Sequence, residues 1–153
     1  MNKCTFLAAR LREVFLDGKW IANTNFKEQL LAVNKDEAVR KIGSLNSIAE
    51  LTFHVTYYVK GFLHVMEGGE LNMHDKYSFS LPPVLTQNDW EELRNDFLRS
   101  TEKFCEKVEK LPESRLDEYF VEEKYGTWQR GLEGVIEHSY YHLGQVSLLR
   151  KLG

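Results

Sequence analysis

The chain has 153 residues but only two cysteines, Cys4 and Cys105, which lie far apart in the sequence. Neither belongs to a CxxC pair, so the sequence offers no disulfide framework and no cysteine-based zinc motif. We therefore expect both cysteines to be free, buried thiols that take no part in metal binding.

Long apolar runs are also missing, since no stretch reaches the roughly 20 residues that a membrane-spanning helix needs. Arg10, Arg12 and Glu13 interrupt the N-terminal segment, which is therefore unlike a signal peptide. The chain also has no large excess of either charge, because it contains 20 basic and 23 acidic residues, and the basic residues do not form a stripe. These absences predict a soluble, cytoplasmic protein with neither a membrane nor a nucleic acid as its partner.

Helical periodicity is abundant instead, within an ordinary composition of 42% hydrophobic and 28% charged residues. Four long segments are expected to be helices, over about residues 5–17, 48–67, 87–111 and 128–151. Pro82 and Pro83 exclude a helix between the second and third segments, so a long crossing loop is expected there. The predicted fold is one all-α domain over residues 1–153, a four-helix bundle with a long crossover connection.

Local signals add detail to this bundle. Ser47 with Glu50 forms a capping-box pattern at the start of the second helix, and Asn34 with Glu37 forms another. The second pattern lies in residues 23–42, which are expected to make two short helical turns. On the first helix, the periodicity places Phe6 together with Leu7 and Leu11 on the inward side.

Two histidines of the last expected helix, His138 and His142, are four residues apart, which places both imidazoles on one face. Imidazole binds zinc, nickel, copper or iron, and three protein ligands with one open position are typical of a catalytic zinc site. His54 is the best-placed third ligand because it lies within the second helix. His64 lies roughly 80° around that helix, and His74 follows a glycine-rich stretch, so we discount both.

An isolated H-x3-H pair is a weak signal, and two ordinary surface or core histidines are the alternative interpretation. The histidine stripe continues into Gly131 and Gly134, which indicates either a close helix contact or room for a ligand. Ser139 stands where an HExxH motif has its glutamate, so a zinc-peptidase mechanism is not expected.

The order of these features resembles the DinB-like superfamily of four-helix bundles, which also includes bacillithiol- and mycothiol-dependent transferases. The resemblance covers nearly the whole chain and rests on Trp20, Asn46-Ser47-Ile48, His54, Lys76-Tyr77-Ser78-Phe79, Pro82-Pro83, Tyr125-Gly126-Thr127 and Glu137-His138 through His142-Leu143-Gly144-Gln145. It implies that His54, His138 and His142 bind one divalent metal ion, often nickel or zinc, and that the chain pairs into a homodimer. Many members of the family have no known substrate.

The leading hypothesis is a metal-dependent enzyme whose zinc, nickel or iron ion activates water or a low-molecular-weight thiol for hydrolysis or S-transfer. Trp20, Tyr58, Arg130 and Tyr141 are candidate residues of the substrate pocket, with ordinary packing as the alternative for each. The competing hypothesis is a non-catalytic metal-binding or stress-responsive interaction protein. In either case metal affinity should fall below about pH 6.5, because only neutral imidazole binds a metal.

Overall fold

The computed structural model describes all 153 residues and contains helices but no β-strand. Its long helices are α1 (Lys3–Arg12), which continues into a π-helical turn over Glu13–Asp17, α4 (Ile48–Met66), α5 (Gln87–Glu109) and α6 (Trp128–Leu152). Between α1 and α4 lie the short helices α2 (Phe26–Leu31) and α3 (Lys35–Val39), and 3-10 turns occupy Asp75–Tyr77, Glu113–Asp117 and Glu123–Tyr125. The predicted all-α bundle is confirmed. None of the helices combines the length and apolar character that a membrane crossing requires.

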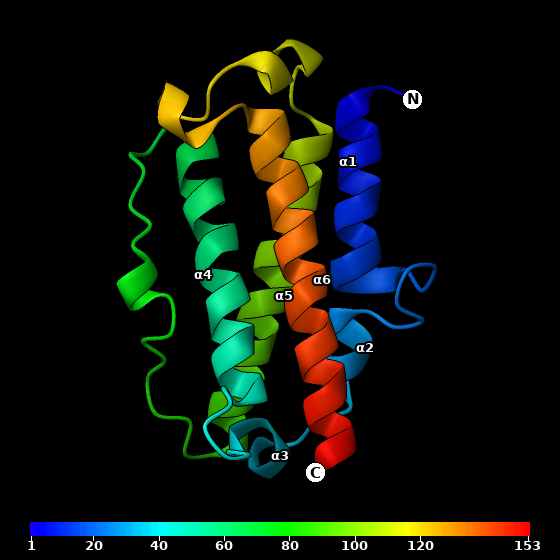
Figure 1. The fold of residues 1–153 in the computed structure, drawn as a ribbon, viewed down its shortest axis with the longest axis vertical. Coiled ribbons are helices and arrows are strands. Elements are labelled where there is room, and N and C mark those ends of the chain that lie inside the picture. The colour runs from blue at the N-terminus through cyan, green and yellow to red at the C-terminus, as the bar shows by residue number, and fades with distance from the viewer.

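The crossover between α4 and α5 determines the topology of the bundle. In Figure 1, α4 and α5 run in the same direction, so the chain between them returns along the whole length of the bundle on the outer side of α4. Helices α1 and α6 run in the opposite direction, and α6 packs against α4. Two antiparallel helices, α4 and α6, therefore face each other next to the crossover.

Side-chain caps explain where the helices begin. The hydroxyl of Ser47 accepts a hydrogen bond from the Glu50 N–H, while the Glu50 carboxylate accepts one from the Ser47 N–H. Asn34 and Glu37 form the same reciprocal pair at α3. Both predicted capping boxes are confirmed. The threonine hydroxyl of Thr127 accepts from the Arg130 N–H and starts α6.

The core is one cluster of 31 buried apolar side chains. Phe15, Phe26 and Phe97 pack at ring-centroid distances of 5.1–6.1 Å, which fastens α2 to the bundle. The indole of Trp90 is fully buried and donates a hydrogen bond to the Val33 carbonyl at 2.8 Å, which positions the chain before α3.

One expectation for α1 is wrong, because Phe6 is exposed rather than inward. The buried stripe of this helix consists of Cys4, Leu7, Ala8 and Leu11, at the spacings of three and four that mark one helical face, and Phe6 lies off that face. Cys4 and Cys105 are free and buried, as predicted.

Candidate metal centre

Helices α4 and α6 bring three imidazoles together. The Nε2 atom of His138 lies 3.1 Å from Nε2 of His54 and 2.9 Å from Nε2 of His142. One ring nitrogen from each histidine lies within 4.8 Å of the other two. Nitrogens that share a tetrahedral ion with bonds of 2.0–2.1 Å are about 3.3–3.4 Å apart. The two Nε2 separations at His138 are a few tenths of an ångström shorter than this, so a slight opening of the cluster would let the three nitrogens share one ion.

The positions of protons and lone pairs on the three imidazole rings also favour a bound cation. The Oε1 atom of Gln145 can only accept, so Nδ1 of His142 donates to it, at 2.6 Å, and Nε2 of His142 presents a lone pair. In one neutral arrangement a single proton on His138 Nε2 is shared between the lone pairs of His54 and His142, and in every other arrangement at least one of the two Nε2 contacts brings two lone pairs or two protons together. A cation among the three nitrogens would instead be bound by a lone pair from each ring.

Burial keeps these imidazoles neutral. Burial, together with the neighbouring His142 and His138, lowers the pKa of His54 to about 4, while the Ser78 backbone and the charge of Asp75 oppose this shift. Burial and His142 lower the pKa of His138 to about 4 as well. The pKa of His142 is also lowered by burial, against the hydrogen bond to Gln145. All three ring lone pairs are available at neutral pH.

Comparison with known proteins identifies the family. A family model described as the DinB superfamily matches residues 23–146, which is more than half of the chain and includes all three histidines. The chain belongs to the DinB superfamily. No curated protein and no solved structure matches it. As a DinB-superfamily member, the chain has a buried three-histidine cluster that is consistent with a divalent metal ion.

The lowered pKa values change the pH dependence expected for this DinB-superfamily chain. Histidines with pKa values near 4 when folded and about 6.5 when unfolded bind more protons in the unfolded state between these values. The free energy of unfolding of the metal-free protein should therefore fall as the pH drops from about 6.5 to 4. Urea denaturation with EDTA at pH 7 and pH 5 measures this, and a His54→Gln/His138→Gln variant should lose less stability. Equal losses would contradict the buried, neutral state.

The crossover covers the cluster on one side. The ring of Phe79 stacks on the imidazole of His54, with centroids 4.0 Å apart and planes within 5°. The Nδ1 atom of His54 is buried without a hydrogen-bond partner, and the nearby Ser78 carbonyl raises its pKa without completing a hydrogen bond of ordinary geometry. Sequence reasoning missed Phe79 as a neighbour of the histidines, because only the path of the crossover brings it there.

Of the four predicted pocket residues, two lie against the histidines. The Tyr58 ring packs edge-on against His54, at 5.1 Å, and its hydroxyl donates to the Asp75 carboxylate on the crossover. The exposed ring of Tyr141 packs against His142 at 5.0 Å.

Trp20 and Arg130 have other surroundings. The Trp20 side chain is 90% exposed in the turn that follows Asp17 and takes part in no aromatic contact with the histidines. The guanidinium of Arg130 is exposed on α6 and forms an ion pair with Glu137, at 3.2 Å. The structure thus brings Tyr58 and Tyr141 into contact with the cluster and gives Trp20 and Arg130 other contacts.

The two glycines on the histidine stripe have different roles. A Cβ atom at Gly131 would come within 3.3 Å of the Phe62 ring, so this glycine allows a close helix contact. A Cβ atom at Gly134 would meet nothing within 4 Å. Open space therefore lies at Gly134, one turn before His138 on α6.

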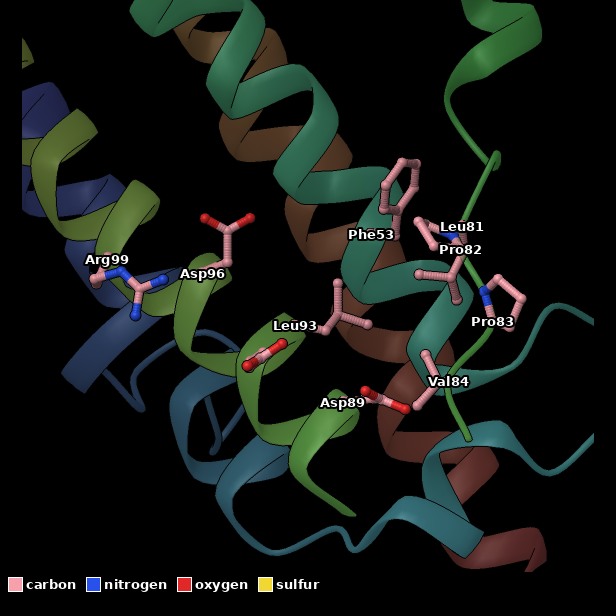
Figure 2. A pocket seen from close by; sticks show the side chains of 10 residues that line it. Phe53, Leu81, Pro82, Pro83, Val84, Asp89, Leu93, Asp96 and Arg99 are labelled. Atoms are coloured by element: carbon pink, nitrogen blue, oxygen red, sulfur yellow. The ribbon is translucent and has the colours of Figure 1, made fainter. Parts of the chain in front are cut away.

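A separate groove of about 700 Å³ lies between α4, α5 and the crossover (Figure 2). Phe53 and the prolines Pro82 and Pro83 form its apolar side, and it contains none of the three histidines. Its three carboxylates already have partners, because Asp89 caps α5, Asp96 pairs with Lys60, and Glu92 accepts a hydrogen bond from the Asn88 amide. The groove is therefore not part of the candidate metal centre.

Proposed function

We propose that this chain is a metal-dependent enzyme in which His54, His138 and His142 hold one divalent ion, zinc, nickel or iron. The observation that carries the proposal is the convergence of three neutral Nε2 atoms from two facing helices. A divalent ion held by imidazoles brings the pKa of a bound water towards neutrality and deprotonates a bound thiol, which supplies a nucleophile for hydrolysis or S-transfer.

The protein's own residues prepare the site for this role. Gln145 fixes the tautomer and orientation of His142 through its hydrogen bond to Nδ1. Phe79 shields one face of His54 from water. The space beside Gly134 leaves room for a small molecule next to His138. These features hold two ligands rigidly while one side of the site stays accessible.

The alternative, a metal-binding protein without catalysis, predicts a closed site. Structural zinc sites usually have four protein ligands, whereas catalytic sites have three and an open position. The cluster here consists of three histidines, two of them buried and the third half-buried. This ligand number supports the enzyme over the non-catalytic alternative.

Activity measurements with defined metals test the proposal. The metal-free protein is loaded with zinc, nickel or iron(II), and bacillithiol, mycothiol, glutathione or cysteine is offered together with the electrophile monobromobimane. We expect one metal–thiol pair to react at least about tenfold faster than the same pair without protein, and the His138→Ala variant to lose this acceleration. Thiol titration into the nickel form, followed by charge-transfer absorption, reports binding independently of turnover. Stoichiometric metal with neither thiol binding nor acceleration of the bimane reaction would favour the non-catalytic alternative.

A further inference from the structure

A second hollow, of about 300 Å³, lies between α4, α6 and the segment that precedes α4. Leucine side chains make up most of its wall: Leu45, Leu51, Leu148 and Leu149. Leu51 and Leu149 are buried, whereas Leu45 and Leu148 are exposed at its rim. An apolar group placed in the hollow would therefore cover leucine surface that now faces water.

The hollow contains none of the three histidines but lies next to them along both helices. Leu51 precedes His54 by three residues on α4, and Gln145 follows His142 by three residues on α6. Three residues of an α-helix rise about 4.5 Å. Since α4 and α6 are antiparallel, both steps lead in the same direction along the bundle. One turn of helix thus separates the hollow from the three Nε2 atoms.

Gln145 belongs to both places. Its Oε1 atom accepts the hydrogen bond from His142, and its side chain also lines the hollow. The Nε2 amide group makes no hydrogen bond within the chain, so its two N–H bonds can donate to a ligand. The hollow thus combines leucine walls with the Gln145 amide on the side of the histidines, and the exposed Ser44 and Asn46 also line it.

We propose that this hollow is the subsite for an apolar group of the substrate, an alkyl or aryl group joined to a hydrogen-bond acceptor. The acceptor would meet the Gln145 amide, and the reacting atom would lie beyond it at the histidines. A volume of about 300 Å³ equals that of roughly ten water molecules in the liquid. The volume of the hollow thus sets the upper size of the alkyl or aryl group that it can hold. The inference rests on the proposed function, whose metal centre gives the subsite its role.

The subsite itself is tested on the metal-free protein with straight-chain alkanols from ethanol to hexanol. Backbone amide chemical shifts of the wall residues give the affinity, which should rise about fourfold for each added methylene until the hollow is full. Leu148→Gln should remove most of this dependence. Leu31→Gln is the matched control, because Leu31 is 52% exposed on α2 and Leu148 is 54% exposed on α6. Equal affinity for ethanol and hexanol, or an unchanged dependence in Leu148→Gln, would overturn the subsite.

Its link to the histidines is tested with alkyl hydroxamates, from acetohydroxamate to octanohydroxamate, on the zinc-loaded protein by calorimetry. Affinity should again rise about fourfold per methylene in the wild type and in Leu31→Gln, but much less in Leu148→Gln. If the alkanols bind but the affinity of the hydroxamates does not depend on their chain length, the hollow takes apolar groups without acting as a subsite of the metal centre. If zinc does not bind at all, the proposed function and the role of the subsite fail together, and the alkanols alone decide whether the hollow takes apolar groups. The increase in affinity per methylene could also change with protein concentration. That result would mean that the leucines form a contact between two copies of the chain, and it would overturn the proposal.

Discussion

Replacing His138 by alanine is expected to weaken zinc binding by at least about a hundredfold. The Nε2 atom of His138 lies between those of the other two histidines, 3.1 and 2.9 Å away, so its loss leaves two ligands without the central one. Four-ligand zinc sites in peptides bind with about 10–16 kcal/mol in total, or about 3 kcal/mol per ligand, and 1.4 kcal/mol corresponds to a factor of ten. Competition with a chromogenic chelator measures the affinity.

The matched control for this variant is His64→Ala, because His64 is an exposed histidine on α4 outside the cluster. It should keep one equivalent of zinc with unchanged affinity. Zinc should also raise the melting temperature of the wild type and of His64→Ala but not of His138→Ala, since only binding to the folded state stabilises it. If His138→Ala still binds a full equivalent of zinc with unchanged affinity, the three histidines do not form the metal site and are ordinary residues of the bundle.

Removing the hydrogen bond behind His142 should have the second-largest effect. Partners that hold a metal-ligating histidine by its other ring nitrogen typically change metal affinity 10- to 100-fold when they are lost. Gln145→Leu keeps a side chain of similar size but cannot accept the proton of His142 Nδ1. We expect zinc affinity to fall by about that factor, measured with the same chelator.

Two further variants separate this positioning role from general stability. Gln145→Glu retains an acceptor at the same place and should restore the affinity. Gln129→Leu removes a glutamine on the same helix that is hydrogen-bonded to Glu133, away from the histidines, and should leave the affinity unchanged. Equal losses in Gln145→Leu and Gln129→Leu would mean that any such substitution in α6 disturbs the site.

The bundle and the histidine cluster follow from patterns that are local in the sequence. Helical periodicity and capping residues such as Ser47 depend on neighbours within one turn, and the structure places the helices close to where these patterns predict them. The four-residue spacing of His138 and His142 fixes their relative direction on α6. The prediction of His54 as the third ligand could not rest on spacing alone. It also used the expectation that the middle of one helix faces the middle of another in a bundle.

The rest of the site depends on the path of the crossover, which no local pattern specifies. Phe79 is brought to His54, and Asp75 to Tyr58, by a segment with little regular structure. Trp20 was expected near the site, but the turn after the π-helical end of α1 turns it towards solvent. Phe6 was misplaced because an aromatic residue beside an apolar stripe resembles a member of it.

The helices that carry the histidines and the crossover that covers them differ in how much sequence change they tolerate. All three candidate ligands lie on α4 and α6, where a change of backbone would disturb the packed core. The wall against His54 comes instead from a surface connection that runs the length of the bundle and is held at points such as the Tyr58–Asp75 hydrogen bond. Surface connections tolerate substitutions and insertions far better than packed helices. Residues 67–86 can therefore change in sequence and length while the three histidines stay in place on the packed helices.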